Sequence, residues 1–308
     1  AEMKKSAHYK AASRILLFSV LSPWFVTYFI WDGPSFGRPD MFLYIFFLMS
    51  CLCIIRRRRL WLVTILTVIG ILSYEVYIII YFPTIFVLLM EEGFILNEKK
   101  ATVHGLVCAV IAVVTTLSVR FLGTMNGRME DSDFYDAVMS RTDVLMSPDI
   151  VYSYPYYRMW DKENIWGYHL RYKLMILVLA MLPIWSYMLG IWLRTVKKEV
   201  DIIKKAVYIL FILTPAPYLM LANHSDYMKY LVGIYTSLIY GIVISIAWGN
   251  ADVCRSVTET DEKYNKRFGV FYYPFLLVLP FMIGICTGEV WPISDLGNAI
   301  VTYMQRLI

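Results

Sequence analysis

Charged residues are scarce in this chain of 308 residues: 17% are Asp, Glu, Lys or Arg, whereas 59% are hydrophobic. A soluble domain of this size needs more polar residues to cover its surface. The composition therefore excludes an ordinary water-soluble globular protein. The mean hydropathy of +0.57 indicates helices that lie in lipid.

The signatures of several soluble enzyme classes are also missing. The sequence has no Walker A motif, no dinucleotide-binding glycine fingerprint, no HExxH and no GxSxG. The five cysteines lie mostly in apolar runs, and the Cys51-Leu-Cys53 spacing is not that of a zinc site. We expect no metal and no cofactor. The net charge of +5 is explained by membrane topology, so we expect no nucleic-acid partner.

Long apolar runs occupy much of the chain, and most are near the ~20 residues that cross a bilayer. With no internal repeat or low-complexity segment, they predict one integral membrane domain over 1–308. Its expected class is all-α, a transmembrane bundle of about nine crossings. The runs are roughly 14–31, 41–55, 60–90, 101–122, 173–193, 206–222, 230–249 and 268–286.

The run 60–90 is too long for one ordinary crossing, and Ser73-Tyr74-Glu75 lies near its middle. Four arginines precede it and Lys99-Lys100 follow it, and short basic loops stay in the cytoplasm. We therefore predict a hairpin over 60–92, made of short helices at about 60–73 and 76–92. Tyr74 and Glu75 would lie at its outer apex. A single tilted helix with a buried Glu is the alternative.

The distribution of basic residues supports this topology, with the N-terminus inside and the C-terminus outside. The predicted inner segments contain 19 of the 29 Lys and Arg residues, although they are short. These segments are 1–14, 56–59, 93–100, 194–205 and 250–267. The predicted outer segments are about 32–40, 74–75, 123–172, 223–229 and 287–308.

The outer segment 123–172 is too long for a simple connection, so we expect a partly structured interfacial loop. It alternates aromatic residues, including Tyr157 and Trp160, with charged residues such as Arg158. Aromatic faces stack on sugar rings and polar groups bind hydroxyls, so the loop predicts a carbohydrate-binding wall. An aromatic belt at the membrane surface is the alternative.

Three charged groups fall at predicted outer helix ends. Arg38 and Asp40 lie in a Gly- and Pro-rich turn, and an Arg there can bind phosphate or anchor a lipid headgroup. Glu75 lies between two apolar half-helices, where an acid forms a functional site or an ion pair. Arg120 is outside these three groups, near the outer end of 101–122, where it joins the Arg38 group or extends to the headgroups.

The third group packs an imidazole, a carboxylate and an amine into a short outer link. It reads Asn223-His224-Ser225-Asp226-Tyr227-Met228-Lys229-Tyr230. A helix that starts near Asp226 would favour an anion beside its first amides. An ordinary polar turn with a helix cap is the alternative.

Three pieces in this order resemble bacterial surface-polysaccharide membrane proteins of the O-antigen and capsule polymerase (Wzy or EpsG-like) group. They are Ser22-Pro23 with Phe36-Gly37-Arg38-Pro39-Asp40, then Tyr74-Glu75 leading to Pro83, then His224-Ser225-Asp226 with Lys229. The resemblance covers about residues 14–250. Tyr74 stands where the group tends to have His, Ser225 separates His224 from Asp226, and Lys229 replaces an Arg.

The resemblance implies a glycosyltransferase of the bacterial inner membrane that joins sugars carried on a polyprenyl diphosphate, without a nucleotide. It also implies polysaccharide assembly proteins as partners and further crossings before residue 1. Such chemistry needs cations for the diphosphate and a base for the acceptor hydroxyl. The expected base is among Glu75, Asp226 and His224, with the two carboxylates favoured. The expected substrate-binding residues are Arg38, Asp40, Arg120, Arg158, Lys229, Tyr157 and Trp160.

Two other functions remain open at this point. A transporter or flippase for a lipid-linked or small polar solute would use intramembrane charges at a midplane site. The absence of an inverted repeat and the position of the candidate residues near one face favour the enzyme. A non-catalytic assembly or immunity subunit would use the outer loop as a docking surface.

Overall fold

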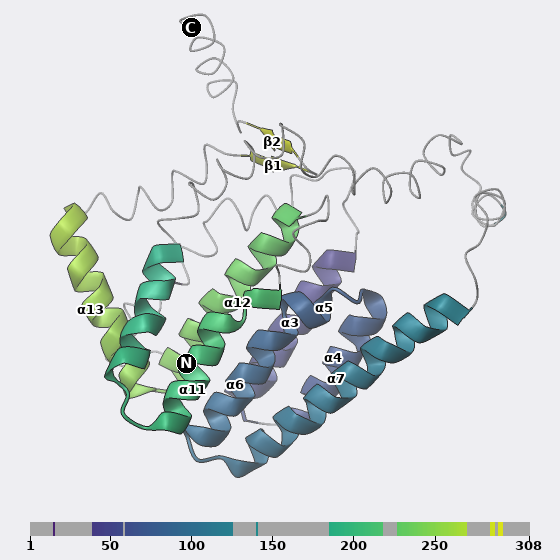
Figure 1. The fold of residues 1–308 in the computed structure, drawn as a ribbon, viewed down its shortest axis with the longest axis horizontal. Helices are drawn as coiled ribbons and strands as arrows, with labels where there is room; N and C mark the ends of the chain where they lie inside the picture. Colours follow the sequence, from purple (N-terminus) through teal and green to yellow (C-terminus); the bar gives the residue numbers. More distant parts are fainter. Residues whose placement is uncertain are drawn as a thin grey trace, which may run out of the picture.

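The computed structural model describes Ile15, residues 39–57, 59–125, Ser140, and residues 185–217, 227–269, 284–286 and 289–291. These residues form a bundle of helices (Figure 1). The helices are α3 (Pro39–Ile55), α4 (Leu60–Ser73), α5 (Tyr77–Ile80), α6 (Phe82–Phe94), α7 (Lys99–Met125), α11 (Ile202–Leu213), α12 (Tyr227–Ala247) and α13 (Ala251–Phe268). Residues 185–198 form a further helix, called helix 185–198.

The described part of the chain confirms the predicted all-α class, with one small exception. Strands β1 (Gly284–Cys286) and β2 (Glu289–Trp291) form an antiparallel pair in which Ile285 faces Val290. The last predicted crossing ran as a helix through Cys286, which is wrong for residues 284–286. Gly284 favours leaving a helix, and the branched and aromatic residues Ile285, Val290 and Trp291 suit extended backbone.

The predicted hairpin over 60–92 is present, and the single long helix is wrong. Tyr74 has extended backbone (φ −164°, ψ 119°) and ends α4, after which α5 and α6 lead away from the apex. At the other end of the hairpin, Glu92 of α6 contacts Arg57, which lies in the turn before α4. The two legs therefore run in opposite directions.

Three of the predicted inner segments, 56–59, 93–100 and 194–205, coincide with turns and the helix ends beside them. Arg57 and Arg59 have positive φ in the turn between α3 and α4. The Asp201 carboxylate caps α11 by accepting from the amides of Ile203 and Lys204. The predicted inner segment 250–267 is helical as α13, and the Asn250 side chain caps its first turn.

The bundle has two groups of helices, which meet where α11 and α12 pack on α6 (Figure 1). On one side, α12 packs on α3, α5 and α6. The Tyr44 and Tyr240 hydroxyls are hydrogen-bonded at 3.0 Å, and the Phe47 and Tyr81 rings stack with centroids 5.0 Å apart. On the other side, Trp192 of helix 185–198 stacks on Phe211 of α11 with centroids 4.2 Å apart. These aromatic contacts form much of the core.

Among the described helices, only α7 is long and apolar enough to cross a membrane by itself, over Lys99–Leu122. The helices Ser237–Ala247 and Ala251–Phe268 pass the same test only together, and they are bent by 116°. Two shorter helices, Phe42–Ile55 and Leu60–Ser73, are also apolar. The described part of the chain therefore does not establish about nine crossings.

Candidate functional site

The break between α4 and α5 places Glu75 at one end of the bundle. The Tyr77 amide donates to the Tyr74 carbonyl at 3.0 Å, which makes a tight corner. Gly70 allows this corner, because a Cβ there would lie 2.8 Å from the Tyr77 ring. The fully buried Tyr77 ring thus packs directly on the α4 backbone. Glu75 therefore lies at the tip of a tightly packed corner.

Arg120 of α7 contacts Glu75 across this end of the bundle. Its Nη1 lies 3.3 Å from Glu75 Oε1, which brings two residues predicted for the site together. Both side chains are accessible, with exposed fractions of 74% for Arg120 and 42% for Glu75. An ion pair this exposed contributes at most about 1 kcal/mol to stability. A ligand can therefore separate the two groups at low cost.

Two other predicted residues are placed by their helices. Asp40 lies in the first turn of α3 and Lys229 in the first turn of α12. Both helices start at the end of the bundle that carries the α4–α5 corner and the last turns of α7 (Figure 1). The structure thus places the backbones of Asp40 and Lys229 at the same end as the Glu75–Arg120 pair.

The remaining predicted site residues lie outside the described residues. They are His224, Asp226, Arg38, Arg158, Tyr157 and Trp160. The expected meeting of Glu75 with His224 and Asp226 stays a prediction. The interfacial loop 123–172 is described only at 123–125 and Ser140, so its carbohydrate-binding wall also stays a prediction.

A second polar cluster, at the opposite end of the hairpin, was not predicted from the sequence. Glu91 is completely buried where α6 meets α12 and the start of α13. Ser245 Oγ lies 2.7 Å from Glu91 Oε2, and Asn250 Nδ2 donates to Glu91 Oε1 at 2.6 Å. The Tyr208 hydroxyl of α11 donates to Asn250 Oδ1 at 3.1 Å. The cluster therefore links four helices.

The neighbouring Glu92 is also completely buried, but it has a cationic partner. Arg57 Nε lies 3.2 Å from Glu92 Oε1, and the arginine side chain is 46% exposed. Arg57 thus reaches from the surface turn to a carboxylate in the interior. The sequence signal for both acids was the Glu91-Glu92 pair directly after the apolar run 60–90.

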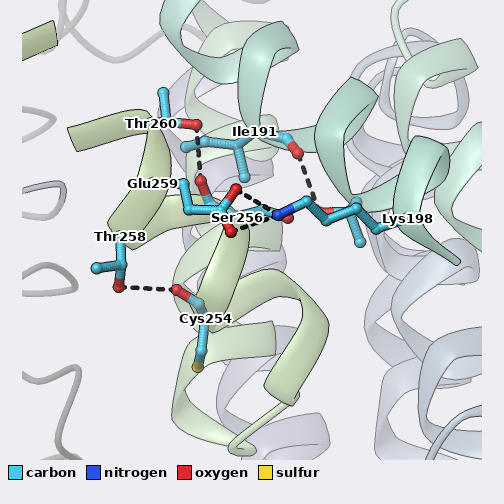
Figure 2. A network of polar contacts seen from close by, with 8 residues as sticks. Ile191, Lys198, Cys254, Ser256, Thr258, Glu259 and Thr260 are labelled. Carbon is cyan, nitrogen blue, oxygen red and sulfur yellow. Dashed lines mark hydrogen bonds and ion pairs between the residues drawn. The ribbon is translucent and has the colours of Figure 1, made fainter. Parts of the chain in front are cut away.

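Polar contacts also hold α13 against helix 185–198 (Figure 2). Lys198 forms an ion pair with Glu259, and this ammonium lowers the pKa of the Glu259 carboxyl. The Tyr187 hydroxyl donates to Asp261 Oδ1 at 3.0 Å. The Thr258 and Thr260 hydroxyls donate to carbonyls of their own helix, those of Cys254 and Ser256. The contacts of Lys198 and Tyr187 dock α13 on helix 185–198, whereas the threonine hydrogen bonds lie within α13, and none of them forms a reactive arrangement.

The described residues contain no group of three or more His, Cys, Asp or Glu side chains arranged to bind a metal ion. The chemistry available at the Glu75 end is acid–base and electrostatic: a carboxylate that takes a proton and a guanidinium that binds an oxyanion. Comparison of the chain with protein-family models, with curated proteins and with solved structures gave no match.

Proposed function

We propose that this chain is a polytopic membrane protein and that its bundle lies in a bilayer. Apolar side chains on three helices point away from the core with exposed fractions of about 40–65%. Exposed apolar surface of this extent is covered by lipid or protein in a native environment. The residues are Phe42, Ile45, Met49 and Leu52 on α3, Trp61, Ile65, Ile69 and Leu72 on α4, and Val103, Leu106, Val110, Val113, Val114, Leu117 and Phe121 on α7.

Within that bilayer, the Glu75 end would face the outer side, because exposed basic residues lie at the other end. Arg56 and Arg59 border the α3–α4 turn, and Lys99 and Lys100 begin α7. Short loops rich in Lys and Arg remain cytoplasmic. The nine crossings, the cytoplasmic N-terminus and the bacterial inner membrane are part of this proposal.

The proposed activity is that of a glycosyltransferase, of the polysaccharide polymerase type, acting on sugars linked to polyprenyl diphosphate. The contact between Glu75 and Arg120 carries the proposal, because it joins a proton acceptor and an oxyanion-binding group at the outer end. Substrate diphosphate would draw Arg120 away from Glu75 and leave the carboxylate free to act as a base.

In the reaction, the acceptor hydroxyl oxygen bonds to the anomeric carbon of the donor sugar. The bond between that carbon and the diphosphate oxygen breaks, and the electron pair leaves with the polyprenyl diphosphate. The hydroxyl proton passes to Glu75 or to Asp226. Arg120 stabilises the leaving anion, together with Arg38, Arg158 and Lys229. His224 and Asp40 orient hydroxyl or diphosphate groups, and Tyr157 and Trp160 bind sugar faces.

The test is reconstitution of the purified protein with polyprenyl-linked oligosaccharide and no nucleotide sugar. We expect chain extension, and a loss of about 10²- to 10⁴-fold in Glu75→Gln. Arg120→Lys should lose nearly as much as Arg120→Ala, because a lysine lacks the planar fork. Glu98→Gln and Arg56→Ala change exposed charges at the other end and should leave extension unchanged. Extension that survives both Glu75→Gln and Asp226→Asn would contradict this proposal.

The topology is tested separately with single cysteines and an impermeant thiol reagent. Ser73 borders the α4–α5 corner, whereas Glu98 and Lys197 are exposed in the predicted inner segments 93–100 and 194–205. In intact cells with a permeabilised outer membrane, we expect labelling at Ser73→Cys and none at Glu98→Cys or Lys197→Cys. Labelling at Lys197→Cys from outside would reverse the proposed orientation.

A transporter or flippase remains the second candidate, because Glu91 and Glu92 are buried acids inside the bundle. Ionisable groups between helices often mark the path of a solute or proton. The same proteoliposomes distinguish the two candidates. Movement of the lipid-linked sugar without chain extension would favour transport.

A further inference from the structure

The buried carboxylate of Glu91 differs from that of Glu92 in its charge balance. Arg57 compensates Glu92, but no Lys, Arg or His of the described residues pairs with Glu91. A buried carboxylate without a counter-charge is strongly disfavoured, so it binds a proton or a cation.

The surrounding titratable groups give no positive charge either. On its own helix Glu91 faces Glu92, on α11 it faces Tyr208, and on α13 it faces Cys254, with Asp252 beyond Tyr208. From α12 the described contact is the neutral Ser245 hydroxyl. Each of these groups is neutral or negative, so none of them compensates an ionised Glu91.

The hydrogen-bond geometry at Ser245 accommodates a proton on Glu91. Ser245 Oγ lies 2.7 Å from Glu91 Oε2 and 2.9 Å from the Gly241 carbonyl oxygen. One hydroxyl has one proton and can donate to only one of these acceptors. When Ser245 donates to Gly241, the short contact to Glu91 is satisfied only if Glu91 donates to Ser245 Oγ.

We propose that Glu91 is a proton-binding site in the interior of the bundle, and that its proton completes the chain from Glu91 through Ser245 to the Gly241 carbonyl. The other carboxyl oxygen accepts from Asn250, which caps α13 directly after the bend from α12. The protonated carboxyl thus holds α6 to this bend. Loss of the proton leaves an uncompensated charge in the core and weakens the contact of α6 with the bend between α12 and α13.

Infrared spectroscopy of the purified full-length protein tests where the proton resides. At neutral pH we expect the carbonyl stretch of a protonated carboxylic acid, shifted in D2O, in the unmodified protein. The band should vanish in Glu91→Gln, whose amide can make the same two hydrogen bonds. It should persist in Glu92→Gln, the matched control on the same helix. Absence of the band at neutral pH, or its loss in Glu92→Gln alone, overturns the proposal.

The pH dependence of unfolding gives a second test, independent of glycosyltransferase activity. Folded protein that retains a proton released by the unfolded chain loses stability as the pH rises. We compare the unfolding equilibrium constant of the unmodified protein with that of Glu91→Gln. Their ratio should rise about tenfold per pH unit over the pH range in which the unfolded chain has released this proton and the folded protein still binds it. A ratio independent of pH contradicts proton binding.

Replacement of sodium by choline at constant ionic strength separates the proton from a metal cation. We expect no change in the stability of the unmodified protein. A sodium-dependent stability that is lost in Glu91→Gln would show that sodium occupies the site, and it would overturn the proposal.

Discussion

Replacement of Gly70 by Ala tests the corner that holds Glu75. A Cβ at Gly70 would lie 2.8–2.9 Å from three atoms of the Tyr77 ring, well inside van der Waals contact. The ring is fully buried and packs beside Tyr81, with centroids 5.6 Å apart, so it cannot move into free space. Gly70→Ala therefore forces a shift of either α4 or α5.

Two opposing contributions decide the size of the effect. Ala is favoured over Gly inside a helix by about 0.8–1.0 kcal/mol. Overpacking of a filled core costs about 1–3 kcal/mol. The net effect of Gly70→Ala should be a loss of about 1 kcal/mol. In Gly190→Ala the new Cβ would lie 4.0 Å from Thr260 Cγ2, an ordinary contact, so that variant should gain stability.

The assay is thermal unfolding of purified protein, followed by circular dichroism in one detergent for all variants. Gly70→Ala should melt several degrees below Gly190→Ala, with the unmodified protein between them. Tyr77→Leu in the Gly70→Ala background removes the clash, so the two changes should be coupled in a double-mutant cycle. A melting temperature of Gly70→Ala equal to or above that of Gly190→Ala would refute the reasoning.

Two further predictions concern helix 185–198. Trp192→Ala removes a buried ring stacked on Phe211 and should lower the free energy of unfolding by about 3–5 kcal/mol. Trp61→Ala, at an exposed position, should lower it far less, and denaturant unfolding measures both values. Because Lys198 lowers the pKa of Glu259, their ion pair should stabilise the fold at neutral pH. This stabilisation should be lost as the pH falls through the lowered pKa of Glu259 in the folded protein. The difference in the free energy of unfolding between the unmodified protein and Glu259→Gln should therefore become smaller at acidic pH. A difference that persists at acidic pH would contradict this assignment.

Local signals in the sequence predicted the helix ends well. Ser73-Tyr74-Glu75 marked the apex of the hairpin, and the four arginines at 56–59 marked the turn between α3 and α4. These features depend on residues that are adjacent in the chain. The charges of 250–267 predicted its inner side but not its helical state, although its buried residues recur with helical spacing, as at Val253, Val257 and Thr260.

Long-range contacts could not be predicted in the same way. Glu91 lies 154 residues before Ser245 and 159 residues before Asn250, so only the packing of α6 on α12 brings them together. The sequence placed Glu91 beside a basic inner loop, where an acid is expected to be hydrated. Its burial depends on how closely α12 and α13 cover α6, which no local pattern specifies.

The Glu75–Arg120 pair and the Glu91 cluster lie at opposite ends of the bundle, and this separation limits how they can cooperate. Along α12, Lys229 and Ser245 are about 24 Å apart at 1.5 Å per residue. Along the second leg of the hairpin, Glu75 and Glu91 are separated by a similar length of mainly helical chain. A proton on Glu91 therefore cannot take part directly in bond formation at Glu75. Any influence of one end on the other has to pass through movement of whole helices, and the Asn250 contact at the bend between α12 and α13 is where such movement is restrained.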